Sequence, residues 1–417
     1  MRVENFHWEE CDHSLNEWAS KLLGVERFSP DSDRLNKYFT PFKEALKNIP
    51  IITIAGTNGK GQSCLLLEEY LLQAGLRPLL WSSPHILSVR ERFSFEGKLV
   101  SGEKLMGVFK ENENLSSELT FYEFIFFCFC ELAKEYGEDE KAVLIFEVGL
   151  GGRLDAVNFF DADICAVTSI GRDHVEFLGS SLKGILHEKL GVSRRGKPLV
   201  SGVTQSFLRE ELVAFCEEKE IPLQLLPLKE EATFQERNEW VSRRLFDEFM
   251  QGDKIEVLTP HVLWARPFKV TYQKQEFTLV GSHNLDGLRS LAHWVSNQAS
   301  VGNLSQERCS GFDEVWVGMS RSDEEDVFHC LELIKNSPCM GQRVRLFEFD
   351  HPRATSLEKL RIAWNRGEET ERKVSFETDF KYLFENSQRD QRVLVCGSYY
   401  FIGALLHFAP VRERLYQ

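Results

Sequence analysis

The stretch IITIAGTNGKGQSCLLLEEYLLQAG, residues 51–75, predicts a strand, a glycine-rich loop and a helix in direct succession. Its three isoleucines form a short β-branched run, which is typical of a buried parallel strand. Three glycines interrupt the run, and apolar residues at helical spacing follow from Leu65. Glycines at such a turn let backbone N–H groups approach an anion, and the start of the next helix favours negative charge. We therefore expect a phosphate-binding loop with Lys60 as its cation.

The loop differs from the standard Walker A pattern, in which a Ser or Thr follows the lysine and its hydroxyl binds magnesium. Here Lys60 is followed by Gly61, Gln62 and Ser63. A glycine-rich turn that contains a lysine can also be purely structural, so the rest of the chain has to distinguish the two interpretations.

The bulk properties describe a globular protein of more than one domain. The chain has 417 residues, which is more than one hydrophobic core usually supports. A net charge of −14 disfavours nucleic acid and anionic membranes as partners. The ten cysteines lie mostly in apolar runs without metal-ligand spacing, which indicates buried thiols in a reducing compartment. Because no signal-peptide or membrane-spanning run is present, we expect a cytoplasmic protein.

Strand-like and helical segments alternate along the whole chain, as in RPLLWSS, AVLIFEVGL and DICAVTSI with helices between them. Continuous apolar strands separated by helices predict a parallel sheet that is covered on both faces. Beyond about residue 260 the alternation begins again, from QEFTLVGSHN to RVLVCGSYY. We predict an α/β protein with a larger P-loop-type domain, residues 1–272, whose sheet is mostly parallel. A smaller C-terminal Rossmann-like α/β domain, residues 273–417, would follow it.

Unusual polar residues follow three of the predicted strands, and ligands of open α/β sheets collect at such strand ends. Ser83 follows LLWSS, Glu147 lies in VLIFEVGL, and His174 follows ICAVTSI. Each residue alone is more often part of a turn or a solvated surface. A buried carboxylate, however, costs several kcal/mol without a partner, and Mg²⁺ beside nucleotide phosphates would be one. Ser83 and Glu147 suit such a site, whereas a histidine is less expected.

The chain resembles folylpolyglutamate synthases and bacterial dihydrofolate synthases, within the superfamily that includes the Mur peptidoglycan ligases. The resemblance rests on motifs that occur in the family's order across nearly the whole chain, and the ordered series is highly specific although each motif alone is weak. The motifs are AGTNGKG, SSPHILSVRERF, LTFYEF, FEVGLGGRLDAVN, TSIGRDHVEFLG, HEKLGV, GSHN and CGS. The resemblance implies that residues 1–272 are an ATP-binding central domain with an N-terminal pterin-loop segment. Residues 273–417 would be a glutamate-ligase-type domain.

The resemblance also implies roles for single residues. Lys60, His174 and Lys189 are implied to be catalytic, and Lys189 matches a lysine that the family carries in N-carboxylated (carbamylated) form. Carbamylation would turn this cation into an anion that can support a magnesium site. The implied metal ligands are Ser83, Glu147 and His174. The implied ATP-binding residues are Gly56, Thr57, Asn58, Gly59, Lys60, Gly61, Gln62, Asn238, Arg266 and His283. The implied pteroyl-site residues are Thr120, Phe121, Tyr122, Glu123, Leu154, Asp155 and Ala156.

The implied activity is that of an ATP- and Mg²⁺-dependent amide ligase. The γ-phosphoryl group would move to a substrate carboxylate, and the α-amine of L-glutamate would then attack the acyl phosphate. Such transfer depends mainly on positioning and charge neutralisation. The implied substrates are dihydropteroate, tetrahydrofolate or both, and a second divalent ion or K⁺ is a further candidate cofactor. We expect a monomer with neither nucleic acid nor membrane as a partner.

Three positions depart from the family's pattern. Gln62 replaces a Ser or Thr, Val280 stands where the family has an Asp that contacts the nucleotide, and Leu22 replaces an Asp of the dihydropteroate site in bifunctional bacterial enzymes. These changes leave open a degenerate paralogue that binds nucleotide or folate without ligating. A Mur-type cell-wall peptide ligase is the other alternative. Those enzymes carry an extra N-terminal domain, for which the residues before the phosphate loop at 56 are too few.

Overall fold

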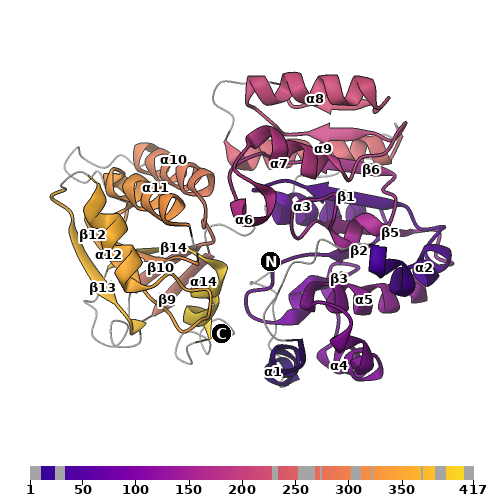
Figure 1. Cartoon of the computed structure of the whole chain (residues 1–417), viewed down its shortest axis with the longest axis horizontal. Coiled ribbons are helices and arrows are strands. Elements are labelled where there is room, and N and C mark those ends of the chain that lie inside the picture. Colours follow the sequence, from indigo (N-terminus) through magenta and orange to yellow (C-terminus); the bar gives the residue numbers. More distant parts are fainter. Residues whose placement is uncertain are drawn as a thin grey trace. The chain divides into compact units, whose positions relative to one another are not determined.

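The computed structural model describes the chain in two units, each of which is considered by itself (Figure 1). The described residues up to 251 form the larger unit, and those from 268 onward form the smaller one. The described ranges are 11–23, 33–227, 233–251, 268–272, 275–301, 311–320, 323–367, 370–380 and 391–407. In this part of the chain, no helix has both the length and the apolar character needed to cross a bilayer.

The larger unit contains, among the described residues, an eight-stranded sheet in the order β4-β3-β2-β5-β1-β6-β7-β8. Neighbouring strands pair in parallel except β2 with β3 and β3 with β4, so only the short strand β3 runs against the others, which confirms the predicted, mostly parallel sheet. The strands are β1 (Ile51–Ala55), β2 (Arg77–Trp81), β3 (Phe93–Phe95), β4 (Lys98–Leu99), β5 (Ala142–Glu147), β6 (Ile164–Val167), β7 (Leu199–Ser201) and β8 (Leu223–Leu225).

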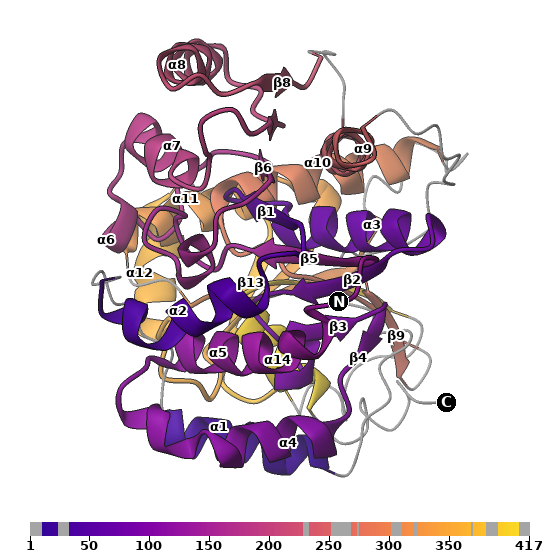
Figure 2. The same ribbon diagram turned by 90° about the vertical axis from the view of Figure 1, so that its right-hand side faces the viewer.

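Helices cover both faces of this sheet, which is why every residue of β1 and β5 is buried. The helices α3 and α9 pack on the face that carries Ile52 and Ile54. The helices α2, α5, α7 and α8 pack on the other face, and α1 and α4 lie side by side against α5 (Figure 2). The helices are α1 (Cys11–Leu23), α2 (Asn36–Ala45), α3 (Lys60–Gln73), α4 (Gly102–Glu111), α5 (Phe121–Ala133), α6 (Val175–Leu178), α7 (Leu182–Leu190), α8 (Ser206–Glu218) and α9 (Phe234–Phe249).

The smaller unit has a second sheet with the strand order β13-β12-β11-β14-β10-β9, which is parallel except for β9. This is the smaller α/β domain that the sequence predicts. The strands are β9 (Phe268–Tyr272), β10 (Gln275–Val280), β11 (Glu314–Gly318), β12 (Arg343–Phe347), β13 (Lys373–Glu377) and β14 (Arg392–Gly397). The helices are α10 (Leu285–Val301), α11 (Glu324–Lys335), α12 (Leu357–Arg366) and α14 (Tyr399–Leu406).

The domain division predicted after residue 272 follows β9 directly. Because β9 pairs with β10, it already belongs to the second sheet. The chain passes from one unit to the other within residues 252–267, which lie outside the described ranges.

Candidate active site

The segment from β1 through α3 consists of a strand, a loop and a helix, as its sequence predicts. Gly56 has a φ of +147° and Gly59 a φ of +94°, which L side chains rarely adopt. Neighbouring side chains also leave no room, because a Cβ at Gly56 would lie 1.9 Å from the Thr168 hydroxyl oxygen, and one at Gly59 2.3 Å from the Asn238 amide oxygen. Both positions therefore require glycine.

Lys60 is the first residue of α3, and its ammonium group lies against the loop. Its Nζ donates hydrogen bonds to the carbonyl oxygens of Gly56 at 3.0 Å and Thr57 at 3.2 Å. The cation is thus held over the backbone turn, beside the first N–H groups of the helix. This arrangement is suited to a bound phosphate, which both the cation and the helix start attract.

Side-chain hydroxyls fasten this loop to the segment that follows β6. The Thr57 hydroxyl donates to the Gly171 carbonyl at 3.2 Å and accepts from the Gly171 N–H at 3.0 Å. Thr168 Oγ1 donates to the Asn58 carbonyl at 2.8 Å, and the Asn58 N–H donates to Ser169 Oγ at 2.9 Å. Thr57 and Asn58 were predicted to contact phosphate, and their attachment to Thr168, Ser169 and Gly171 of the TSIGRDH motif was not predicted.

Glu147, the last residue of β5, lies beside the start of α3. The residue is 4% exposed, and its Oε2 accepts a hydrogen bond from the Ser83 N–H at 3.1 Å. A Cβ on Gly61 would lie 3.4 Å from both carboxylate oxygens, which is van der Waals contact, so the carboxylate lies directly against the first turn of α3. Burial raises the pKa of Glu147, and the nearby charge of Lys60 opposes that rise.

Ser83 and Glu147 fit a hard divalent cation. The Ser83 hydroxyl and Glu147 Oε1 have no hydrogen-bond partner in the described part of the chain, and both are oxygen donors of the kind that Mg²⁺ prefers. No cluster of three His, Cys, Asp or Glu side chains forms among the described residues. His174 is 44% exposed, has a φ of +49°, and lies 3.9 Å from the carboxylate oxygens of Asp173 and Glu176. Its membership of the metal site stays a prediction.

Lys189 in α7 is 4% exposed and makes no hydrogen bond or ion pair with the described residues. Its pKa is lowered to about 7, first by burial and then by the charge of Lys60, while the charges of Asp173 and Asp155 oppose this shift. These charges come from the phosphate loop helix and from the segments that follow β5 and β6. Lys189 is therefore a buried amine in the same region as Lys60.

The two segments predicted to line the pteroyl site meet at Tyr122 and Asp155. The Tyr122 hydroxyl donates to Asp155 Oδ1 at 3.0 Å and accepts from Trp81 Nε1 at 3.1 Å. Asp155 Oδ2 accepts from the N–H groups of Gly149 at 2.9 Å and Leu150 at 3.0 Å. Burial raises the pKa of Asp155 to about 6, while these donors oppose the rise. Asp155 thereby orders the glycine-rich loop that follows β5.

The other predicted pteroyl residues have varied surroundings. Thr120 and Glu123 form a capping box at the start of α5, and Glu123 also pairs with Arg34. The Phe121 ring stacks on His85 at 6.2 Å and lies 5.4 Å from the Arg92 guanidinium. Buried Arg92, whose Nε donates to His85 Nδ1 at 2.9 Å, lies in the motif SSPHILSVRERF but was not among the predicted site residues. Leu154 is half-buried and Ala156 is buried.

The remaining predicted nucleotide residues are distributed over both units. Asn238 in α9 donates from Nδ2 to Gln62 Oε1 at 2.7 Å, so the structure brings these two together. His283 follows β10 in the smaller unit, where its ring lies 5.3 Å from that of Tyr399. Val280 is buried in the apolar core of that unit. Arg266 and the side chain of Leu22 lie outside the described parts of the chain.

The class of this protein is a two-domain protein with a Mur-ligase-like fold. It is defined by the glycine-rich loop with its lysine, the buried carboxylate beside that loop, and the two α/β units. Within this class, a dihydrofolate synthase/folylpolyglutamate synthase of Haemophilus influenzae is 37% identical over 217 residues, which are 49% of this chain and 47% of the relative. The Bacillus subtilis protein of the same name is 24% identical over 93% of this chain and 95% of its own length.

A crystal structure of bifunctional folylpolyglutamate synthase/dihydrofolate synthase from Yersinia pestis, complexed with AMPPNP and a Mn ion, has the same fold. Its TM-score is 0.72 at 25% identity, and the match covers 94% of this chain and 97% of that one. No family model matches the chain. The chain spans about half the length of the more identical curated relatives. These comparisons confirm the resemblance to bacterial dihydrofolate and folylpolyglutamate synthases that the ordered motifs predict.

Proposed function

We propose that this protein is an ATP- and Mg²⁺-dependent amide ligase that adds L-glutamate to dihydropteroate, to tetrahydrofolate, or to both. The observation that supports this most directly is the phosphate loop with Lys60 and the buried carboxylate of Glu147 next to it. The names of the relatives agree with such an activity.

The residues of the loop bind and orient the triphosphate. The N–H groups at the start of α3 and the ammonium of Lys60 stabilise the negative charge that spreads over the phosphoryl oxygens during transfer. Glu147 and Ser83, with His174 by resemblance, would hold the Mg²⁺ ion, which supplies charge neutralisation between the phosphates. A substrate carboxylate placed in line with the γ-phosphoryl group would become an acyl phosphate, which the glutamate amine attacks with loss of phosphate.

Lys189 is proposed to act in its carbamylated form. A pKa of about 7 leaves much of the buried amine neutral at physiological pH, and the neutral amine is the form that adds CO₂. The resulting carbamate is an anion, so it would remove the repulsion between Lys189 and Lys60 and add negative charge beside the proposed magnesium site.

The pteroyl group is proposed to lie near the loop that Asp155 orders and the stacked rings of Phe121 and His85. The two rings there offer a flat surface for a pterin, and the hydroxyl of Tyr122 holds Asp155 by a hydrogen bond. L-glutamate and the pteroyl substrate are carried over from the relatives' names.

The deciding experiment is ligation in the presence of ATP, Mg²⁺ and L-glutamate, with dihydropteroate and tetrahydrofolate tested in parallel. We expect glutamate-dependent phosphate release and a product enlarged by one glutamate with at least one acceptor. Lys60→Ala is the negative control and should give neither phosphate release nor a ligated product. Tight nucleotide binding without any ligated product would instead support the degenerate paralogue.

A further inference from the structure

Gln62, which replaces the family's hydroxyl residue, makes a specific contact across two helices. Its Oε1 accepts a hydrogen bond from Nδ2 of Asn238 at 2.7 Å. Gln62 lies in the first turn of α3, whereas Asn238 lies in the second turn of α9 and is only 2% exposed. Two side-chain amides, 176 positions apart, therefore form a pair at the edge of the phosphate loop.

The position of Asn238 is fixed by its surroundings. Ser242, one turn further along α9, donates from Oγ to the carbonyl of Asn238 at 2.7 Å and to that of Ser63 at 3.0 Å. The side chain of Asn238 also fills the space where Gly59 has no Cβ. Helix α9 is thus attached to the loop and to the first turn of α3 at successive positions, and Asn238 has little freedom to turn.

The pairing determines what Gln62 can offer to a ligand. Because Oε1 is occupied by Asn238, the carbonyl end of the Gln62 amide faces α9. Its Nε2 group carries two N–H donors, and no described residue accepts a hydrogen bond from them. The same helix turn carries the Lys60 cation and unpaired backbone N–H groups. All of these groups are donors, so the ligand that satisfies them is an anion rich in acceptor oxygens, such as a phosphate.

We propose that Gln62 binds the nucleotide phosphates directly through its Nε2 group and that Asn238 is a positioning residue that holds the Gln62 amide in this orientation. The inference rests on the proposed function, because it takes the loop to be a nucleotide site. A loop hydroxyl of the Walker type acts through magnesium. An amide donor needs no metal, so nucleotide binding at this position is less dependent on the divalent cation than a hydroxyl would make it.

The test is the binding of ADP to the full chain by calorimetry, once with excess Mg²⁺ and once with EDTA. Gln62→Ser removes the amide and restores a hydroxyl. It is expected to weaken ADP binding roughly tenfold in EDTA, which corresponds to the loss of one hydrogen bond to a charged group. The loss in Mg²⁺ should be clearly smaller. Gln73→Ser, at the exposed far end of the same helix, is the matched control and should bind as the wild type does.

Asn238→Ala tests the positioning role. The Gln62 amide would then rotate freely, and we expect roughly a threefold to tenfold loss of ADP affinity in EDTA. In the double variant Gln62→Ser/Asn238→Ala, the second change should add little, because residues that act as a unit are not additive. A purely structural Asn238 would instead weaken binding equally in both backgrounds and with or without Mg²⁺.

Two outcomes would overturn the inference while leaving the proposed function intact. One is that Gln62→Ser binds ADP in EDTA as well as the wild type does. The other is that the losses of the two single variants add fully in the double variant. A wild-type protein that binds no ADP under either condition would overturn the proposed function itself. The melting temperature of each variant without ligand distinguishes a loss of contact from a loss of fold.

Discussion

Lys60 is the side chain on which the proposed phosphoryl transfer depends most. Its ammonium group donates hydrogen bonds to two loop carbonyls, and further hydrogen bonds from Thr57 and Asn58 hold the same loop. We expect Lys60→Ala to abolish ligation and the stabilisation of the protein by ATP, because a ligand stabilises only the state that it binds. Thermal unfolding with and without ATP measures this. Turnover near the wild-type rate would show that the phosphate-loop assignment is wrong.

Thr57 connects the phosphate loop to the segment that bears His174. Thr57→Val keeps the shape but leaves the buried N–H and carbonyl of Gly171 without their partner, which should cost about 1–3 kcal/mol of unfolding free energy. Thr57→Ser keeps the hydroxyl and should lose much less. Urea unfolding of the two variants provides the comparison, and equal stabilities would contradict this role of the hydroxyl.

Lys189 gives a pH dependence with a definite sign. Its pKa falls from 10.5 to about 7 on folding, so between these values the unfolded state binds more protons, and unmodified Lys189 makes stability rise with pH. Carbamylation should likewise increase as pH rises through 7, because only the neutral amine adds CO₂. Carbon-13 NMR with labelled bicarbonate should show a carbamate signal that grows over this range. A signal that persists unchanged in Lys189→Ala would assign the carbamate to another group.

At the scale of single residues, local sequence patterns predicted the positions whose role depends on backbone conformation. Gly56 and Gly59 were recognised because glycines at such a turn let backbone N–H groups approach an anion, and the structure adds that both have positive φ values. The partners of Gln62 and Tyr122 could not be predicted in this way. Gln62 meets Asn238 through helix packing, and Tyr122 meets Asp155 through the arrangement of α5 against the sheet. Such pairs depend on tertiary structure, which one sequence does not encode in any short motif.

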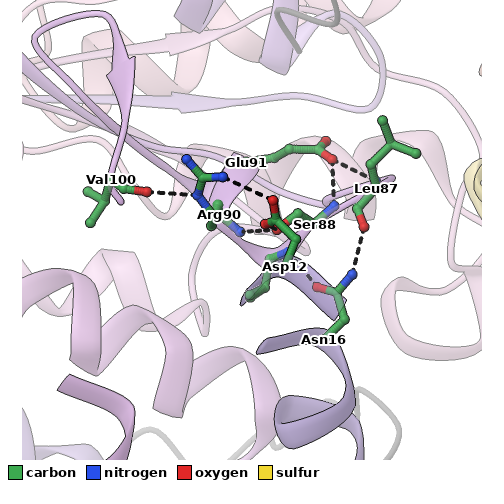
Figure 3. Close-up of polar contacts among 8 residues, drawn as sticks. Asp12, Asn16, Leu87, Ser88, Arg90, Glu91 and Val100 are labelled. Atoms are coloured by element: carbon green, nitrogen blue, oxygen red, sulfur yellow. Dashed lines mark hydrogen bonds and ion pairs between the residues drawn. The ribbon is translucent and has the colours of Figure 1, made fainter. Parts of the chain in front are cut away.

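At the scale of elements, helix α1 is attached to the loop that follows β2 (Figure 3). Asp12 is fully buried, pairs with Arg90 at 3.0 Å and accepts a hydrogen bond from the Ser88 hydroxyl. Asn16 donates to the Leu87 carbonyl at 2.7 Å and accepts from the Val89 N–H at 2.9 Å. The attached loop lies between His85 and Arg92, which are the residues near Phe121. Helix α1 thus holds one wall of the proposed pteroyl site.

Removal of Asp12 should therefore affect both stability and substrate binding. Asp12→Ala leaves the buried cation of Arg90 without its carboxylate, which typically costs about 3–5 kcal/mol. We also expect a raised KM for the pteroyl substrate with little change in the KM for ATP, because the phosphate loop lies in other elements. Urea unfolding and steady-state kinetics measure the two effects. Lys21→Ala, which removes an exposed ion pair of the same helix, is the control and should change neither.

Element types were easier to predict than element neighbours. The β1, loop and α3 unit follows from its apolar periodicity and its glycines, whereas the capping box of Thr120 and Glu123 that begins α5 was not predicted. The short antiparallel strands β3 and β4 were not predicted, because three and two residues carry no usable periodicity. Periodicity also cannot predict that β1 lies between β5 and β6, because strand order depends on how the crossover connections pack.

At the scale of the whole molecule, each unit has an apolar core of its own. The core of the larger unit includes Phe126 and Phe146, and that of the smaller unit includes Val317 and Leu394. The renewed alternation of strands and helices after residue 260 was enough to predict this division into two. The boundary was harder to place, because β9 is an antiparallel edge strand that precedes the parallel pattern of its own sheet.

Val280 departs from the family's pattern and lies in the smaller of the two units. An Asp at this position contacts the nucleotide in the family by resemblance, but here Val280 is 2% exposed and packs in the apolar core of the smaller unit. Val280→Asp would bury a carboxylate among apolar side chains, which costs several kcal/mol without a partner. We therefore expect the variant to destabilise the smaller unit while the larger unit, with its separate core, stays folded and still binds ADP.

Hydrogen exchange of the full chain measures this unit by unit. Amides of β11 and β14 should lose protection in Val280→Asp, whereas those of β1 and β5 should keep it, because exchange through local unfolding reports the stability of each cooperative unit. Val280→Thr, which introduces only a hydroxyl, is the matched control and should lose far less protection. Full protection in β14 together with tighter ADP binding would contradict this prediction. The new carboxylate would then contact the nucleotide and would not disrupt the apolar core.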